Sequence, residues 1–276
     1  MNVVINAMKL MLDSGPEGAV PLRWLFKRTT SINRRFAQKA TVSVTQDDLH
    51  QLVTINGETY AWPKGVPYDD LLVFASEQGQ ADHPHKYAWG KTRIHPGDVV
   101  LDIGACEGSF GASAAAAGAE VIAVEPSRIM QGVIRKFFEV RGLPQPRILG
   151  CLVGSSARQC YFYDNPERPG SSRVELAPGA ETYPVPMRTL DEILGDLNLT
   201  RLDFIKCDAE GADVDILKSG RESLKKFRPK LALCTYHNDG DYLALFHFLQ
   251  ELGYHIEGKG FLHGGSKFRV HMLHAW

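Results

Sequence analysis

The sequence predicts an α/β protein whose core is a mostly parallel, seven-stranded sheet with helices on both faces. Beyond Gly97, short apolar runs alternate with helical stretches, a pattern typical of parallel sheets with crossover helices. Several of these helical stretches end at a glycine, which commonly terminates helices. The composition, 44% hydrophobic and 23% charged, is ordinary for a globular protein, and 276 residues are enough to bury a large core.

The strands expected in this sheet are short and rich in valine, isoleucine and leucine, as strands buried on both faces are. In chain order they cover residues 99–103, 120–124, 147–153, 203–207, 230–235, 254–257 and 268–273. The helices expected between them cover residues 109–117, 128–141, 214–227 and 241–252. Strands joined through helices run in the same direction, so most of the sheet is expected to be parallel.

Residues 1–80 are expected to form an N-terminal extension, followed by the parallel-sheet domain at 81–276. Apolar residues at helical spacing predict helix within residues 1–40. Strand-like runs on both sides of Asn56-Gly57 predict a β-hairpin, because this dipeptide accepts the positive φ angles of a tight turn. A further strand at 41–45 and a helix at 67–79 complete the extension.

Residues 155–190 interrupt the alternation of strands and helices. They contain Tyr161-Phe162-Tyr163, two proline-containing loops and a strand-like run at 182–188. So long a connection is uncommon in a compact domain and is often functional. We therefore expect an insertion here, and a lid over a binding site is one interpretation of it.

The charge balance excludes a general attraction to nucleic acid. Lys and Arg number 31 against 32 Asp and Glu, a net charge of −1. Residues 19–41 depart from this balance, because they hold basic residues and no acidic one. Three interpretations stay open for this stretch: a solvated helix face, a contact with a partner chain or second copy, and an anionic surface such as lipid headgroups or a phosphorylated or carrier-linked substrate. The basic residues are Arg23, Lys27, Arg28, Arg34, Arg35 and Lys39.

The cysteines and the N-terminal residues predict a reduced, cytoplasmic protein. The chain has five cysteines and no close pair, which fits neither a disulfide framework nor a zinc-binding motif. The apolar run Val3–Leu12 is far shorter than the roughly 20 residues of a membrane span. It also has no basic segment before it and no clear cleavage site after it, so we expect no signal peptide.

A glycine-rich turn follows the first strand of the expected sheet. Gly104 and Gly108 allow the backbone to approach a ligand closely, and ligands of open α/β sheets bind at this carboxyl edge. Glu125 ends the next strand, 23 residues after Asp102, where a carboxylate can accept both hydroxyls of a ribose. A plain tight turn, with Asp102 capping the helix, is the alternative.

The residues of this turn favour one class of cofactor. A nicotinamide site is expected to carry G-x-G-x-x-G directly after the strand. Here Asp102 stands at the first glycine position, and a carboxylate is poorly placed beside a pyrophosphate. The carboxylate of Asp102 suits a cationic cofactor without phosphate, such as S-adenosylmethionine. We therefore expect S-adenosylmethionine, and a nicotinamide oxidoreductase is a disfavoured alternative.

Six motifs together carry a family resemblance. They are Asp102-Ile-Gly-Ala-Cys-Glu-Gly108, Ala123-Val-Glu-Pro-Ser127, Thr189-Leu-Asp-Glu-Ile193, the run 202–213, Ile216-Leu-Lys-Ser-Gly220 and the run 230–237. With these motifs the chain resembles the FkbM family of class I S-adenosylmethionine-dependent methyltransferases, over about residues 95–260. The resemblance implies the Rossmann-like class I methyltransferase fold and O-methylation of a small molecule, natural product or saccharide, as a rule without a metal. The chain departs from the family at Cys106, where asparagine is frequent, and at Ala209, where a β-branched residue is frequent.

The predicted cofactor-binding residues lie on the glycine-rich turn and at the ends of the next strands. They are Asp102, Gly104, Ala105, Cys106, Glu107, Gly108, Ser109, Glu125, Pro126, Ser127, Leu152 and Asp208. Four further residues that precede the first strand are candidates to fold over the cofactor: His83, His85, Lys86 and Tyr87.

Methyl transfer to a hydroxyl needs an aligned acceptor and a base, so polar residues at the sheet edge are the catalytic candidates. Asp208 and Glu210 follow one strand and His237 follows the next, and we predict these three as catalytic. The alternatives are a helix cap for the carboxylates and a structural role for the imidazole. We expect no metal, although two carboxylates and an imidazole are also a ligand set for a divalent ion.

Other functions stay open at this stage. One is methylation of nitrogen or of a carboxylate, on a protein or another acceptor. Another is a cofactor-binding interaction module without catalysis. The expected partner is a small-molecule or saccharide substrate, with no nucleic acid; a homodimer is an open alternative.

Overall fold

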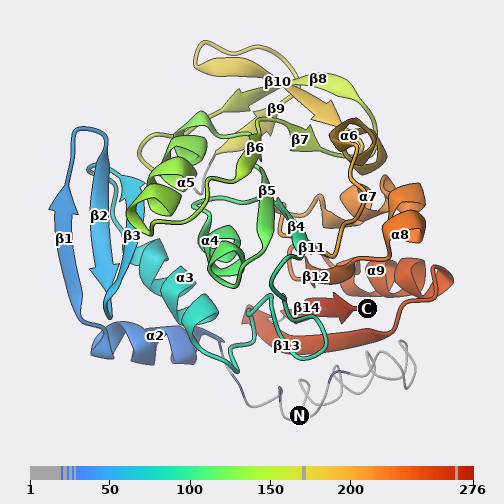
Figure 1. Ribbon diagram of the computed structural model, residues 1–276, viewed down its shortest axis with the longest axis horizontal. Helices are drawn as coiled ribbons and strands as arrows, with labels where there is room; N and C mark the ends of the chain where they lie inside the picture. Colours follow the sequence, from blue (N-terminus) through green and yellow to red (C-terminus); the bar gives the residue numbers. More distant parts are fainter. Residues whose placement is uncertain (1–19, 21–23, 25–26, 28, 170–171, 265–266) are drawn as a thin grey trace.

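The computed structural model describes residues 20, 24, 27, 29–169, 172–264 and 267–276. A seven-stranded sheet lies at its centre, with strand order β13-β14-β12-β11-β4-β5-β6 (Figure 1). Neighbouring strands from β6 to β12 are parallel, and β14 runs antiparallel to both β12 and β13. The expected mostly parallel, seven-stranded sheet is therefore confirmed. The strands are β4 (Val99–Ile103), β5 (Glu120–Val124), β6 (Arg147–Leu149), β11 (Phe204–Cys207), β12 (Lys230–Cys234), β13 (Ile256–Gly264) and β14 (Lys267–Ala275).

Helices cover both faces of this sheet. Alternate residues of each strand point to opposite faces, and both sets are apolar, so each face packs against helices. Leu101 and Ile103 of β4 belong to one buried cluster, which includes α6, α8 and α9. Val100 belongs to the other, with α3, α4 and α5. No helix of the described residues has the length and hydropathy of a membrane span. The helices after β4 are α4 (Ser109–Ala116), α5 (Arg128–Val140), α6 (Leu190–Leu197), α7 (Asp213–Lys218), α8 (Arg221–Phe227) and α9 (Asp241–Glu251).

Two predicted elements are each split in the structure. The strand expected at 147–153 is β6 plus β7 (Leu152–Val153), and β7 pairs with a second sheet. The helix expected at 214–227 is α7 plus α8, which meet at Gly220. A Cβ atom on Gly220 would lie 2.5 Å from Cδ2 of Leu190, so glycine is needed for α6 to pack against this bend.

The extension before the core consists of a helix, a three-stranded antiparallel sheet and a second helix. Asn56 and Gly57 have φ angles of 51° and 89°, which confirms the predicted hairpin turn. Of the helix predicted within residues 1–40, the described part begins at Thr29; residues 1–19 lie outside the described residues. The elements are α2 (Thr29–Lys39), β1 (Val42–Gln46), β2 (His50–Ile55), β3 (Glu58–Pro63) and α3 (Asp69–Gly79).

The extension and the core share buried contacts. The ring of Tyr60 in β3 stacks on Phe137 of α5, with ring centroids 5.1 Å apart. One buried cluster contains residues from both sides of residue 80, including Trp62 and Phe138. The domain boundary at residue 80 stays a prediction, and the packing across it is continuous.

The insertion at 155–190 supplies most of a second sheet, with strand order β7-β10-β8-β9, at the upper edge of the molecule in Figure 1. Its new strands are β8 (Arg158–Tyr163), β9 (Arg173–Glu175) and β10 (Thr182–Arg188). Asp164 ties this sheet to the start of α5, because it accepts hydrogen bonds from Ser127 Oγ (2.6 Å) and Ile129 N (3.1 Å). The insertion is thereby held beside the carboxyl edge of β5.

Candidate active site

The turn from β4 to α4 brings two predicted motifs into contact. Gly104 and Gly108 have φ angles of 70° and 87°, and Cys106 between them has 50°. A Cβ atom on Gly104 would lie 2.0 Å from the carbonyl oxygen of Asp208. Glycine is therefore required where the turn meets the end of β11.

Glu125 holds this turn from the end of β5. Its carboxylate accepts hydrogen bonds from the backbone N–H of Cys106 and of Ser127, both at 2.8 Å. Burial raises the pKa of Glu125 to about 7, against the opposing effect of these two bonds. Each carboxylate oxygen has a second lone pair, so the group can still accept hydrogen bonds from a ligand.

A cavity of about 430 Å³ opens beside Glu125. The core sheet supplies one wall and the insertion supplies another, with Phe162 and Val174 among its apolar residues. An apolar slot next to a carboxylate suits a flat base attached to a sugar. Seven predicted cofactor residues line this cavity: Gly104, Cys106, Glu125, Pro126, Ser127, Leu152 and Asp208.

A second cavity, of about 310 Å³, adjoins the first. Gly104, Cys106, Asp208 and Glu210 line both, so the two cavities meet at the glycine-rich turn. Three predicted cofactor residues line only the second: Ala105, Glu107 and Ser109. Gly108 and Asp102 line neither.

Asp102 lies beneath the turn, fully buried. Nζ of Lys206 is 3.0 Å from Asp102 Oδ1 and donates a hydrogen bond to the carbonyl of Ile103 at 3.2 Å. Burial lowers the pKa of Lys206, but the carboxylates of Asp102 and Asp208 outweigh this and raise it. Lys206 therefore stays protonated and balances the charge of Asp102; direct cofactor contact by Asp102 stays a prediction.

The structure brings the three predicted catalytic residues together. Nε2 of His237 lies 3.5 Å from Asp208 Oδ1 and 3.7 Å from Glu210 Oε2. Nδ1 of His237 lies 3.3 Å from Asp213 Oδ2. Burial lowers the pKa of His237, and the neighbouring carboxylates, Asp213 first, outweigh it and raise the value. Both ring nitrogens are buried, and His237 lines neither cavity, so it reaches the cavities only through Asp208 and Glu210, which line both.

Residues outside the predicted catalytic set complete the second cavity. The hydroxyl of Tyr87 donates to Asp208 Oδ2 at 2.7 Å, and Nε2 of His85 lies 3.6 Å from the same oxygen. Nδ1 of His85 lies 2.7 Å from Oε2 of Glu77. Burial lowers the pKa of His85, but Glu77 and Asp208 raise it to about 10. The sequence indicates His85 and Tyr87 as residues that fold over a cofactor. Glu77 was not predicted, because it lies on α3 with no motif around it.

Asp208 is thus surrounded by hydrogen-bond donors and cations. Burial raises its pKa, but the facing His85, Lys206 and His237 hold the value well below its usual range. The carboxylate stays ionised at the point where the two cavities meet. The other two residues predicted near the cofactor lie elsewhere: His83 contacts Asn33 of α2 at 2.9 Å, and Lys86 donates to the carbonyl of Gln78.

The model of the FkbM methyltransferase domain matches residues 102–256, which is more than half of the chain. The chain belongs to the FkbM methyltransferase family. The matched residues include the glycine-rich turn, Glu125 and all three predicted catalytic residues. Glu77, His85 and Tyr87 precede the FkbM domain, so part of the second cavity is built by the residues before it.

Three solved structures of methyltransferases are similar to this FkbM-family chain. A methyltransferase FkbM from Methylobacillus flagellatus is 19% identical with a TM-score of 0.49; the alignment covers 90% of this chain but only 59% of that one. A precorrin-6y C5,15-methyltransferase from Geobacter metallireducens is 17% identical with a TM-score of 0.42, over 79% of this chain and 93% of that one. A magnesium protoporphyrin IX methyltransferase from Synechocystis, with bound SAM, is 17% identical with a TM-score of 0.38, over 65% of this chain and 70% of that one. No curated protein matches the sequence.

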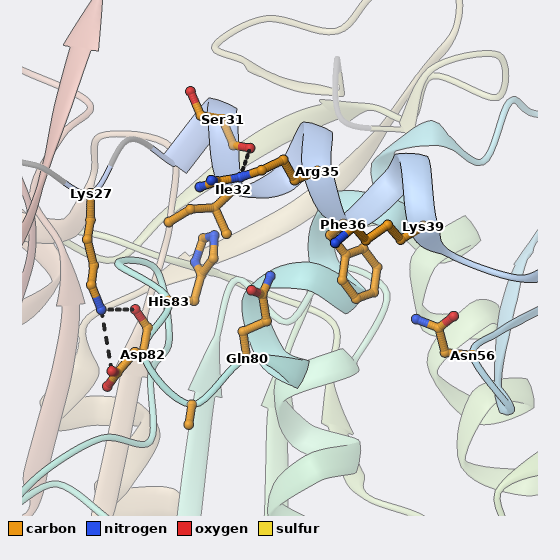
Figure 2. Close-up of a pocket in the computed structure, with 11 residues that line it drawn as sticks. Lys27, Ser31, Ile32, Arg35, Phe36, Lys39, Asn56, Gln80, Asp82 and His83 are labelled. Carbon is orange, nitrogen blue, oxygen red and sulfur yellow. Dashed lines mark hydrogen bonds and ion pairs between the residues drawn. The ribbon is translucent and has the colours of Figure 1, made fainter.

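The basic stretch at 19–41 borders a separate groove of about 890 Å³, outside the FkbM domain (Figure 2). Lys27, Arg35 and Lys39 line it. Lys27 pairs with Asp82 at 3.4 Å, and Nε of Arg35 donates to the carbonyl of Ser31 at 3.2 Å (Figure 2). Arg23 and Arg28 lie outside the described residues. The three interpretations of this stretch remain predictions.

Proposed function

We propose that this FkbM-family methyltransferase transfers the methyl group of S-adenosylmethionine to a hydroxyl of a small molecule, natural product or saccharide. The observation that carries the proposal is the meeting of two cavities at Gly104, Cys106 and Asp208. A group-transfer enzyme needs two binding sites whose ligands touch at one point. The larger cavity suits the nucleoside of the cofactor, and the smaller suits the amino-acid end of the cofactor together with the reacting end of an acceptor.

The residues of the larger cavity fit an adenosine. Glu125 would accept hydrogen bonds from the ribose, and the apolar walls from the core and the insertion would enclose the base. At the start of α4, Oγ of Ser109 is buried without a hydrogen-bond partner in the wall of the second cavity. An unpaired buried hydroxyl beside a helix N-terminus suits the amino-acid end of the cofactor, whose carboxylate is anionic.

The bound cofactor supplies a methyl carbon that its sulfonium has already activated. The residues of this chain hold the acceptor in line and exclude water. Asp208 lies at the junction and would accept a hydrogen bond from the acceptor hydroxyl, next to the one from Tyr87. As the oxygen–carbon bond forms and the methyl–sulfur bond breaks, the hydroxyl proton would leave by way of the Asp208 carboxylate to water, since the low pKa of Asp208 means that it does not keep the proton. Nε2 of His237 lies 3.5 Å from the other carboxylate oxygen, Oδ1, and so helps to fix the orientation of Asp208.

Labelled methyl transfer tests this proposal. Calorimetric titration should first show binding of S-adenosylmethionine. The protein is then incubated with methyl-tritiated cofactor and matched acceptors that carry a hydroxyl, an amine or a carboxylate. We expect label on hydroxyl acceptors that survives mild alkali, which hydrolyses methyl esters but not ethers. Transfer to amines or carboxylates alone contradicts methylation of a hydroxyl. Absence of cofactor binding contradicts the proposal as a whole.

A further inference from the structure

We propose that His85, Asp208 and Cys234 bind one thiolate-preferring divalent metal ion, such as Zn²⁺, at the edge of the second cavity. Nε2 of His85 lies 3.2 Å from Sγ of Cys234 and 3.6 Å from Oδ2 of Asp208. All three ligand atoms lie within 4.8 Å of one another, and this is the one such group of His, Cys and carboxylate residues in the described part of the chain. Ligands at zinc-bond lengths of about 2.0–2.3 Å in a tetrahedral site are separated by roughly 3.3–3.8 Å. An ion would therefore fit among them with little rearrangement.

The sheet positions two of these ligands. Cys234 ends β12 and Asp208 follows β11, and the two strands pair in parallel with Cys207 opposite Leu233. Both ligands therefore emerge at the same carboxyl edge. His85 comes from the segment that precedes β4 and closes over them. Cys234 is fully buried and His85 is buried, so the geometry is set by packed elements and not by a flexible loop.

Glu77 orients the histidine for metal binding. Its Oε2 lies 2.7 Å from Nδ1 of His85, which keeps a proton on Nδ1. Nε2 faces Cys234 and Asp208, so a metal ion there would displace the Nε2 proton and take its lone pair. Metal-binding histidines commonly have such a carboxylate partner on the other ring nitrogen. Glu77 is itself buried, so the pairing is protected from water.

The ligand types select the metal. A thiolate with an imidazole and a carboxylate suits zinc and similar transition metals, whereas Mg²⁺ prefers oxygen ligands. The hydroxyl of Tyr87 lies 3.2 Å from His85 Nε2 and 2.7 Å from Asp208 Oδ2, so a fourth ligand of the ion would enter beside it. His85, Tyr87 and Asp208 line the second cavity, so that position is accessible to water or to an acceptor oxygen.

Such an ion would lower the pKa of a coordinated hydroxyl and so assist its deprotonation. This catalytic role rests on the proposed function, but binding of the metal does not. The metal ion bound by Asp208 would then activate the acceptor hydroxyl, and His237 would act by positioning Asp208.

Cobalt substitution tests the metal site independently of activity. The full chain is stripped with a chelator and titrated with Co²⁺, and we expect one equivalent bound with an intense near-ultraviolet sulfur-to-cobalt band. Zn²⁺ should abolish the band and Mg²⁺ should leave it. Cys234→Ser should remove the band, and Glu77→Gln should weaken Zn²⁺ binding about 10- to 100-fold. Cys160→Ala is the matched control, because Cys160 is equally buried but lies in β8, and it should retain the band.

Two outcomes overturn the site. One is the absence of a sulfur-to-cobalt band in the native chain; the other is an undiminished band in Cys234→Ser, which would place the metal on another cysteine. If Cys234→Ser does not fold by circular dichroism, His85→Gln decides, since unchanged Zn²⁺ affinity in a folded variant also contradicts the proposal.

Titration of the metal-free chain with S-adenosylmethionine separates the metal site from the proposed methyl transfer. Cofactor binding without a cobalt band removes only the metal site.

Discussion

The carboxylate of Glu125 connects the glycine-rich turn to the larger cavity. It accepts one backbone hydrogen bond on each oxygen and keeps a lone pair on each for a ribose. We expect Glu125→Ala to weaken S-adenosylmethionine binding at least tenfold, about 1.4 kcal/mol or more, in a calorimetric titration. Glu120→Ala is the matched control, because Glu120 is exposed at the opposite end of β5. Unchanged affinity in a folded Glu125→Ala variant would rule out the ribose assignment.

The raised pKa of Glu125 predicts a pH dependence of cofactor binding. Burial brings this pKa to about 7, well above the ordinary value for glutamate. The ribose needs the ionised carboxylate as an acceptor, so affinity should fall as the pH drops through 7 and level off above about 8. Dissociation constants measured from about pH 6 to about pH 9 should show this slope, up to tenfold per pH unit below 7. Glu125→Gln should bind weakly at every pH; an equal slope in that variant would assign the titration to another group.

We expect His237 to act as a positioning residue for Asp208, because it lines neither cavity and its Nε2 faces Asp208 Oδ1 at 3.5 Å. We expect His237→Gln to lower kcat by about tenfold or more, since misplacement of a catalytic group is costly. The KM for S-adenosylmethionine should stay the same. Steady-state kinetics with both substrates checks this division. If kcat is unaffected, His237 is structural only.

Most of the predicted site residues line the two cavities, but the contacts between residues far apart in the chain were not predictable from the sequence. Gly104, Glu125 and Asp208 lie at fixed distances from strand ends, and the parallel sheet places all strand ends at one edge. His85 and Cys234 are 149 residues apart, and neither belongs to a spacing pattern of metal sites. Their proximity depends on how the segment before β4 packs over β12, which no local signal encodes.

At the scale of the elements, a close contact marks where the predicted helix at 214–227 is split, and pairing with the second sheet separates β7 from β6. The length of the run 214–227 suggested one helix, but the backbone at Gly220 must pass under Leu190. Ser219 lies at the break between α7 and α8 and satisfies the start of α6. Its carbonyl accepts a hydrogen bond from the N–H of Asp191, and its hydroxyl accepts one from the N–H of Leu190. A sequence signal for α6 was present in Thr189-x-x-Glu192, and the structure shows the full capping box.

This contact predicts opposite effects for two glycine substitutions. Gly220→Ala places a methyl group 2.5 Å from Leu190 Cδ2 and should destabilise the protein by about 1–3 kcal/mol. Gly195→Ala lies on α6 itself with nothing within 4 Å, and it should be neutral or stabilise by up to about 1 kcal/mol. Urea unfolding of both variants measures the difference. Equal stabilities would mean that α6 moves away from the bend at little cost.

At the scale of the whole molecule, the extension packs against the core and lines part of the second cavity. The second cavity takes Phe74 and Glu77 from α3, and His85 and Tyr87 from the segment that follows it. The three-stranded sheet reaches the same body through α5, where Tyr60 stacks on Phe137. Residues on both sides of position 80 thus build one site, which explains why the family motif alone does not contain all of it.

This continuity predicts one cooperative unfolding transition, and Tyr60 tests it. Tyr60 is 5% exposed and lies between β3 and α5. Tyr60→Ala removes a buried ring and should lower the free energy of unfolding by about 3–5 kcal/mol, as truncation of a buried aromatic ring does. Val44→Ala is the control, because Val44 is exposed on β1 and its truncation should change stability by less than about 0.5 kcal/mol.

Two signals followed through the same denaturant series test the cooperativity: far-ultraviolet circular dichroism and binding of S-adenosylmethionine. Both should be lost at one midpoint, and Tyr60→Ala should shift that midpoint for both. An early transition that leaves cofactor binding at its native midpoint would instead make residues 1–80 an independent domain.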